Sequence, residues 1–166
     1  MKQSFVRAVD KLKPLKEISK IAQKLREQNL TIVTSNGCFD LLHIGHLYSL
    51  EESRSKGDVL IVGLNSDESI RRYKGASRPI IPEKERALML ASLECVTYTT
   101  IFEEDNPIEF LKAVKPAIHC KGTEYSDGSR PMPEKAVVES YGGCIEYISL
   151  INEKSTTGII STLQNC

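Results

Sequence analysis

The sequence predicts an α/β fold in which helices cover both faces of one parallel, five-stranded sheet. Short apolar runs of strand length alternate with helix-like stretches along nearly the whole chain. One run, residues 58–64, is apolar almost throughout, which is typical of a parallel strand buried on both faces. The alternation contains neither a linker nor an internal repeat, so we expect one doubly wound domain over residues 1–166.

The first elements follow from apolar spacing. Apolar side chains recur at helical spacing over residues 15–28, with Lys and Glu between them. We expect residues 1–28 to form an N-terminal helical extension packed on the domain. The next elements are, in order, a β-branched strand at 31–34, a helix at 43–56 that ends with Gly57 in the left-handed conformation, and the strand at 58–64.

Glycine, proline and capping residues divide the second half of the chain. A helix should begin near Ser66 or Asp67, either of which could cap it. Residues 74–82 form a loop with one Gly and two Pro, and Pro82 suits the first turn of the next helix. The remaining elements are, in order, a helix to residue 93, a strand at 96–101, a helix at 107–114, a strand at 117–120, a polar segment at 121–132, a helix at 133–141, a strand at 144–148 and a helix at 156–164.

The composition excludes several classes of protein. Lys and Arg number 22 and Asp and Glu number 22, so the formal net charge is zero, and 40% of the residues are hydrophobic. This is typical of a globular domain, whereas a general nucleic-acid or membrane-surface binder needs a basic excess. Residues 1–30 are the exception, with eight basic and three acidic side chains, which we interpret as a solvated helix face.

No membrane, secretory or metal signal is visible. The longest apolar candidate, residues 59–64, is far shorter than the roughly 18 residues of a membrane span. The N-terminus lacks the apolar core and the cleavage site of a secretory signal. The five cysteines include no Cys-x-x-Cys pair, so we expect reduced thiols and a cytoplasmic protein without a dedicated metal site.

The most unusual residues lie in the first loop that follows a strand. Ligands of doubly wound sheets bind beyond the carboxyl ends of the strands. There, His43 and His46 flank Gly45 where a strand gives way to a helix. The free N–H groups of a helix N-terminus favour phosphate, the two imidazoles add donors on one face, and Gly45 permits close approach. The alternative is a pair of capping or core histidines, but two of the three histidines of the chain lie in this window, which favours a phosphate site.

The loop also resembles a known signature. The His-x-Gly-His element after Gly-x-Phe-Asp is similar to that of the nucleotidyltransferase superfamily, which includes cytidylyl- and adenylyltransferases. A wider set of segments resembles the heptose 1-phosphate adenylyltransferases, which perform the nucleotidyl-transfer half of ADP-heptose synthesis. These segments are residues 36–43, 62–67, 74–79, 121–125, 141–143 and 155–157. The resemblance extends from about residue 15 to 164 and implies the Rossmann-like fold of the His-x-Gly-His type. Many such domains are fused to a sugar kinase, and we expect the free-standing form here.

The resemblance implies nucleotidyl transfer from ATP to a sugar 1-phosphate, with release of pyrophosphate. His43 and His46 would stabilise the transition state as hydrogen-bond donors, and Lys74 would neutralise phosphate charge. Without the resemblance, a solvated Lys74 is equally plausible. The nucleotide would be bound by Gly37, Cys38, Phe39, Asp40, Gly45, Asp67, Arg86, Lys121, Gly122, Ser155, Thr156 and Thr157, and the sugar by Arg78, Glu124 and Tyr125.

Several of these assignments have a structural alternative. The resemblance assigns Arg86 to the triphosphate, but an ion pair with Glu83 competes. Asp67 could hold a ribose hydroxyl, although capping of its helix is slightly favoured. The hydroxyls of residues 155–157 could bind the β- and γ-phosphates or cap the last helix. Lipid-headgroup cytidylyltransferases begin this stretch with an Arg that is missing here, which favours the heptose class, and Lys154 could supply the charge.

Other functions remain open. A cytidylyl- or guanylyltransferase acting on another sugar or polyol phosphate, such as glycerol 3-phosphate, would use the same motifs. A non-catalytic nucleotide-binding protein would be expected to have lost part of the set His43, His46, Lys74 and Arg86. We expect Mg²⁺ as cofactor, held by phosphate oxygens rather than by side chains. The expected partners are ATP or CTP and a sugar phosphate, without nucleic acid or membrane, and the resemblance implies a homodimer.

Overall fold

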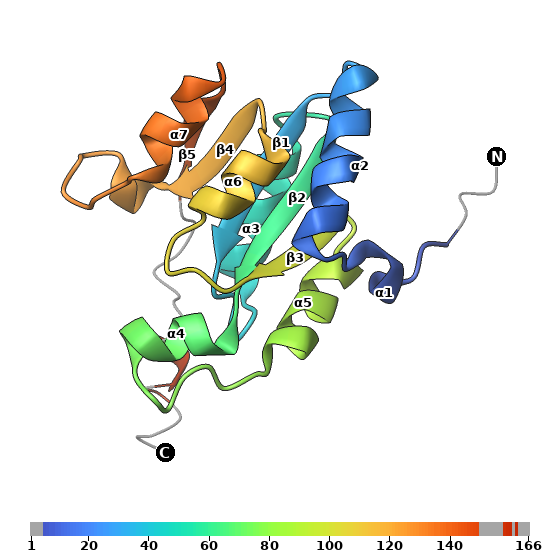
Figure 1. The fold of residues 1–166 in the computed structure, drawn as a ribbon. Coiled ribbons are helices and arrows are strands. Elements are labelled where there is room, and N and C mark those ends of the chain that lie inside the picture. The colour runs from blue at the N-terminus through green and yellow to red at the C-terminus, as the bar shows by residue number, and fades with distance from the viewer. Residues whose placement is uncertain (1–4, 150–157, 161, 163–166) are drawn as a thin grey trace.

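The computed structural model describes residues 5–149, 158–160 and 162 of the chain. Five parallel strands form one sheet in the order β3-β2-β1-β4-β5, seen in Figure 1. The strands are β1 (Ile32–Gly37), β2 (Val59–Asn65), β3 (Tyr98–Phe102), β4 (Ile118–Gly122) and β5 (Cys144–Ile148). The chain builds outward from β1 to β3 and then crosses to the other side for β4 and β5. The predicted fold class, a doubly wound Rossmann-like α/β sheet, is confirmed.

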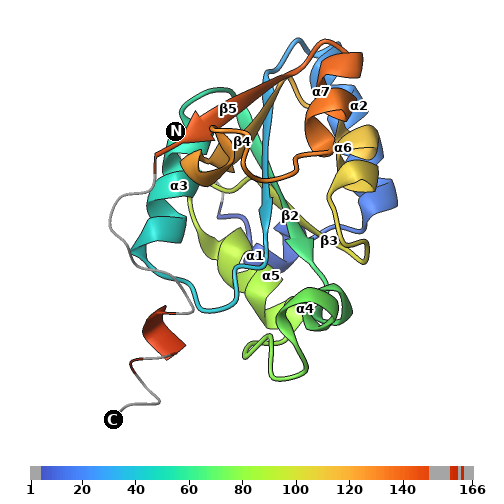
Figure 2. The same cartoon turned by 90° about the vertical axis from the view of Figure 1, so that its left-hand side faces the viewer.

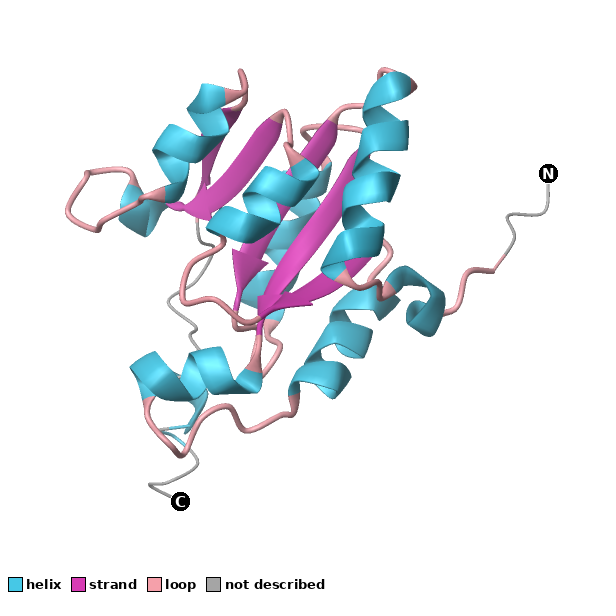
Figure 3. Cartoon of the chain, in the orientation of Figure 1, coloured by secondary structure: helices cyan, strands magenta, loops and turns pink. Residues whose placement is uncertain are grey.

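Helices cover both faces of the sheet, as Figures 2 and 3 show. One face carries α2 (Leu15–Glu27), α6 (Ile108–Val114) and α7 (Glu134–Ser140), and the other carries α3 (Ile44–Arg54) and α5 (Glu83–Ser92). The helix α4 (Asp67–Lys74) lies beyond the carboxyl ends of the strands, and the 3₁₀ turn η1 (Thr123–Tyr125) follows β4 directly.

Two apolar layers hold this arrangement together. Leu50 of α3 and Leu90 of α5 pack on one face of the sheet, with no exposed surface. Ile18 of α2 and Phe110 of α6 pack on the opposite face and are equally buried. The strand β2 is buried along its whole length, which explains why its sequence is apolar almost throughout.

The segment before α2 contains a short helix that apolar spacing did not reveal, α1 (Ala8–Lys11). The ammonium group of Lys11 donates hydrogen bonds to the carbonyl oxygens of Leu93 and Val96, at 3.3 and 2.9 Å. Leu12 forms a parallel bridge with Thr99 of β3. This segment therefore lies along the outer edge of the sheet and covers the open side of β3.

Some details differ from the prediction. The strand β1 continues to Gly37 because its polar last residues still pair with β2, a feature that β-branched composition cannot reveal. Gly57 is not left-handed. A side chain there would meet the carbonyl oxygen of Thr31 at 2.8 Å, so close approach explains the glycine. Residues 158–160 and 162 are helical, and the rest of the expected helix at 156–164 lies outside the described residues.

Candidate active site

A pocket of about 760 Å³ lies at the carboxyl ends of β1 and β4, where the strand order reverses. The last residues of β1 and the loop to α3 form one wall, and the end of β4 with η1 and the following loop forms another. The end of α4 completes the pocket with Tyr73 and Lys74. This is the position at which doubly wound sheets bind their ligands.

The paired histidines lie in this pocket at the start of α3. His43 is the residue before the helix, in an extended conformation, and His46 lies in the first turn. The two rings are stacked with centroids 3.9 Å apart, and Phe39 packs against His46 at 5.3 Å. Gly45 is buried between them, which leaves the helix N-terminus open to a ligand.

His46 is neutral at physiological pH. Burial is the largest cause, and His43 and Lys74 also lower the pKa of His46, to about 4. Its Nδ1 atom is buried and has no hydrogen-bond partner among the residues that the structure describes. A neutral imidazole keeps one N–H donor and one acceptor nitrogen, so His46 can offer a hydrogen bond to a ligand oxygen.

Asp40 organises the loop that brings Arg78 to the pocket. Its carboxylate accepts hydrogen bonds from the backbone N–H groups of Ile80 and Ile81, at 2.9 Å each, and pairs with Arg78 at 2.7 Å. Burial raises the pKa of Asp40, but these N–H groups and Arg78 together lower it below its ordinary value. Asp40 and Arg78, predicted to bind different ligands, are therefore each other's partners, and both line the pocket.

Arg86 occupies a different position from the one expected. Its side chain has no exposed surface and does not line the pocket. The guanidinium donates to the carbonyl oxygens of Ile81, Cys38 and Asn65 and pairs with Asp67 at 2.6 Å. All five N–H groups are used within the protein, so the expected contact with the triphosphate is not supported. The alternative ion pair with Glu83 is also absent from the described contacts.

The expectation for Asp67 needs the same correction. The hydroxyl of Ser66 caps α4 by accepting the N–H of Ser69 at 3.1 Å. Asp67 instead uses its carboxylate to hold Arg86, and its own N–H donates to Glu83 at 2.7 Å. Capping by Asp67 is therefore wrong. A ribose contact is not supported either, because Asp67 does not line the pocket.

The end of β4 carries a nearly buried ion pair that sequence analysis missed. The ammonium group of Lys121 lies 2.7 Å from a carboxylate oxygen of Glu134 and 3.3 Å from the amide oxygen of Asn36. It also lies 4.5 Å from the centroid of the Tyr125 ring. Glu134 opens α7, more than ten residues along the chain, so no local pattern could have paired it with Lys121.

A second missed residue is Tyr73, which closes the pocket from α4. Its hydroxyl lies 2.6 Å from the sulfur of Cys38, in the loop after β1. Burial and then the Cys38 contact raise the pKa of Tyr73 well above its ordinary value, so the phenol stays protonated. Next to it, Lys74 is exposed and lines the pocket, and its ammonium group lies 6.0 Å from the centroid of the Tyr73 ring.

The pocket therefore gathers most of the expected site residues from three separate stretches of the chain, 37–46, 74–78 and 121–125. Their chemical roles stay predictions, as does that of residues 155–157, which lie outside the described part of the chain. The expected residues that line the pocket are Gly37, Cys38, Phe39, Asp40, His43, Gly45, His46, Lys74, Arg78, Lys121, Gly122, Glu124 and Tyr125.

The described residues contain no group of three or more His, Cys, Asp or Glu side chains that could hold a metal ion. In that same part of the chain, no helix is both long enough and apolar enough to cross a membrane.

Comparison with known protein families matches residues 34–163 to the family described as Cytidylyltransferase-like. The match includes His43, His46 and every other residue that lines the pocket. The chain belongs to the cytidylyltransferase-like family. The resemblance to the nucleotidyltransferase superfamily is thus confirmed.

Individual curated proteins are also similar to this chain. The chain is 45% identical over 153 residues to the "Bifunctional protein HldE" of Geobacter metallireducens, covering 92% of this chain and 31% of the relative. It is 50% identical over 139 residues to the protein of the same name from Pelobacter propionicus, covering 84% and 28%. The chain thus spans about a third of the length of these relatives.

A solved structure is also similar to this chain. The lipopolysaccharide core biosynthesis protein of Thermoplasma volcanium aligns with a TM-score of 0.59 and 26% identity, over 75% of this chain and 99% of that one. The fold is therefore shared with a protein whose name refers to lipopolysaccharide core biosynthesis.

Proposed function

We propose that this cytidylyltransferase-like domain transfers the adenylyl group of ATP to D-glycero-β-D-manno-heptose 1-phosphate and releases pyrophosphate. The observation that carries the proposal is the stacked pair His43 and His46 at the open N-terminus of α3, inside the pocket at the switch point of the sheet. The similarity to HldE proteins and to a lipopolysaccharide core biosynthesis protein supports the choice of reaction. The product, ADP-heptose, would serve lipopolysaccharide synthesis.

The reaction needs positioning more than covalent chemistry. A phosphate oxygen of the acceptor forms a bond to the α-phosphorus of ATP, and the bond from that phosphorus to the oxygen bridging to the β-phosphate breaks. The bridging oxygen leaves with the bonding electrons as part of pyrophosphate. Negative charge grows on the oxygens around the α-phosphorus, so fixed donors that face those oxygens lower the barrier.

His43, His46 and the first N–H groups of α3 would be those donors. Neutral His46 can donate a hydrogen bond without losing a proton, which suits a reaction whose attacking oxygen is already ionised. Lys74, exposed at the end of α4, would move onto the phosphates as a flexible cation. Asp40 and Arg86 would act indirectly, since they hold the loops on which Arg78 and Cys38 lie.

Mg²⁺ would enter with the triphosphate, bound mainly to phosphate oxygens. Its contribution when bound is to neutralise part of the phosphate charge. Of the carboxylates that line the pocket, Asp40, Asp105 and Glu134 are each paired with a basic side chain, and Glu124 has no such partner among the residues described. A single unpaired carboxylate supports a metal held mainly by the nucleotide rather than by a cluster of protein ligands. We also propose a homodimer, because symmetric pairs are the commonest assembly.

A product assay with a panel of substrates tests the proposal. The protein is incubated with Mg²⁺, each of the four common nucleoside triphosphates and each of several sugar and polyol phosphates, and pyrophosphate release is measured. We expect the fastest release with ATP and the heptose 1-phosphate. A preference for CTP with glycerol 3-phosphate would favour the alternative cytidylyltransferase, and nucleotide binding without turnover for any pair would favour a non-catalytic protein.

A further inference from the structure

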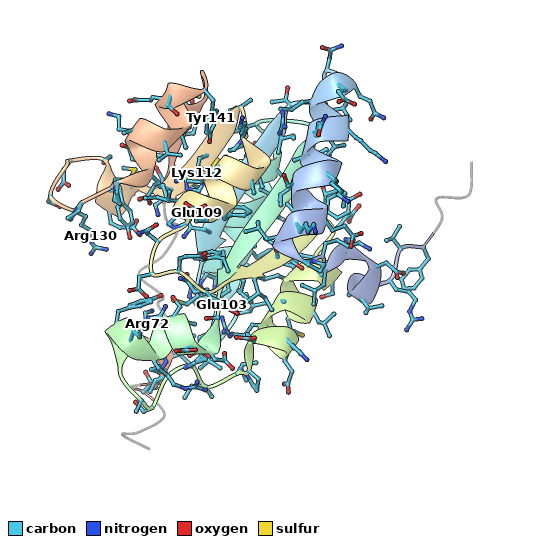
Figure 4. All side chains as sticks on the ribbon, in the orientation of Figure 1. Arg72, Glu103, Glu109, Lys112, Arg130 and Tyr141 are labelled. Atoms are coloured by element: carbon cyan, nitrogen blue, oxygen red, sulfur yellow. The ribbon has the colours of Figure 1, made fainter. Side chains whose placement is uncertain are left out.

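The cations that line the pocket divide into paired and unpaired groups. Arg78 is held by Asp40 and Lys121 by Glu134, at 2.7 Å in each pair. Lys74 and Arg130 also line the pocket, but neither forms an ion pair within the described part of the chain. Lys74 lies on the α4 side of the pocket, whereas Arg130 lies on the loop before α7, labelled in Figure 4.

The loop that carries Arg130 is an ordered turn. The carboxylate of Asp127 accepts the N–H of Ser129 at 2.9 Å, and Gly128 adopts a left-handed φ of 75°. Pro131 follows Arg130 and restricts its backbone to extended conformations. The guanidinium lies 5.6 Å from the centroid of the Tyr125 ring, which supports its flat face and leaves N–H groups for a ligand.

A carboxylate without a basic partner lies on the same wall. Glu124 lines the pocket and forms no ion pair with the residues described. Its carboxylate folds back over Gly122, where a Cβ atom would clash with Oε2. Glycine at this position therefore allows the carboxylate to lie against the backbone at the end of β4. A carboxylate without a cation is repelled by phosphate but accepts hydrogen bonds from hydroxyl groups.

We propose that Arg130 binds the phosphate of the acceptor substrate, next to Glu124, which the family resemblance assigns to the sugar and which would accept hydrogen bonds from its hydroxyl groups. This inference rests on the proposed function and identifies the acceptor as a phosphorylated polyhydroxy compound. A planar guanidinium can bind two oxygens of a phosphate and leave a third free to attack the α-phosphorus. Arg130 would share this part with Arg78, whose guanidinium pairs with Asp40 at 2.7 Å and also lines the pocket.

Kinetics of matched variants test this assignment. The variants Arg130→Gln and Glu124→Gln are compared with Arg71→Gln, an exposed arginine of α4 that does not line the pocket. Loss of a charged hydrogen bond should raise the KM for the acceptor about 10- to 100-fold in the first two variants. The KM for ATP should change less than about twofold, and Arg71→Gln should match the wild type. An equal rise in the KM for ATP, or no change in the KM for the acceptor, would overturn the proposal.

A binding measurement separates this inference from the proposed reaction. Heptose 1-phosphate is titrated calorimetrically into the chain saturated with α,β-methylene-ATP, which cannot be turned over. Binding to the wild type that weakens about 10-fold or more in Arg130→Gln would support the assignment even if the wild type forms no pyrophosphate. Equal binding by both, or no binding to the wild type, would overturn it.

Discussion

The guanidinium of Arg86 lies 2.6 Å from the carboxylate of Asp67, and the arginine side chain has no exposed surface. The same guanidinium donates to the carbonyl oxygens of Cys38 and Ile81, which lie in two different loops, and of Asn65, the last residue of β2. Arg86 thus holds these loops at fixed positions relative to one another. The family resemblance assigned Arg86 to the triphosphate, but the structure gives it a positioning role beneath the site.

This role predicts a stability defect in Arg86→Lys. An ammonium group cannot reach all four acceptors, and a buried polar network that loses a partner costs about 3 kcal/mol or more. Urea denaturation should show this loss, with exposed Arg71→Lys as the matched control. If Arg86 contacted the triphosphate instead, the variant would keep wild-type stability and raise the KM for ATP.

His119 should make stability depend on pH. Burial and then Lys121 lower its pKa to about 3 from an ordinary 6.5, and its Nδ1 atom lies 2.8 Å from the hydroxyl of Thr34. As the pH falls, His119 therefore takes up a proton in the unfolded chain before it does so in the folded protein. Its contribution to the free energy of unfolding is complete above pH 6.5 and is lost as the pH falls toward 3. Between about pH 6.5 and 4.5 the free energy of unfolding should fall by about 2 to 3 kcal/mol from this group.

The variant His119→Asn isolates this effect. The amide can keep the contact with Thr34 but does not titrate. The slope of the free energy of unfolding against pH should therefore decrease by the amount that corresponds to about one bound proton in this interval. The slope, rather than the absolute stability, is the quantity to compare. An unchanged slope would show that His119 is protonated in the folded protein over the same range as in the unfolded chain.

The helix α2 is predicted to be essential for folding. Ile18 is fully buried against the sheet, and truncation of a buried Ile to Ala costs about 2 to 5 kcal/mol. Thermal unfolding of Ile18→Ala should show this loss, whereas Lys16→Ala on the exposed side of the helix should be near wild type. Deletion of residues 1–28 should leave an unfolded chain. A folded, monomeric product of that deletion would mean that α2 is instead a dimer contact.

Metal dependence tests the proposed role of Mg²⁺. A chelator should abolish pyrophosphate formation from ATP and the acceptor, because the triphosphate then lacks the cation that neutralises it. Addition of excess Mg²⁺ should restore the rate. Pyrophosphate formation that continues undiminished in the chelator would contradict the proposal.

The sequence was informative wherever a local pattern carried the signal. Alternating apolar runs predicted five parallel strands, and the helical spacing around Ile18 predicted α2 almost to its ends. The two histidines and Gly45 predicted a site at the start of a helix, and the structure places them in the pocket at the switch point. Parallel strand order explains this success, since it brings the carboxyl ends of the strands to one edge.

What the sequence could not predict depends on contacts between distant residues. Lys121 and Glu134 pair across a loop, and Arg86 meets Asp67 from a different helix, so no spacing rule connects either pair. The short helix α1 has too few residues for a periodic pattern and is fixed by Lys11 at the edge of β3. Gly57 was misjudged because close packing, like a left-handed turn, also requires glycine.

The central claim is that His46 stabilises the transition state of nucleotidyl transfer, and the kinetics of His46→Ala test it most directly. Loss of a donor that pairs with developing charge should lower kcat by about 10²- to 10³-fold, with ATP and heptose 1-phosphate as substrates. The KM for ATP should change little, and His119→Asn, a histidine outside the pocket, should keep nearly full turnover. A variant whose kcat is intact and whose KM alone is raised would contradict the account, because His46 would then bind substrate and transition state equally.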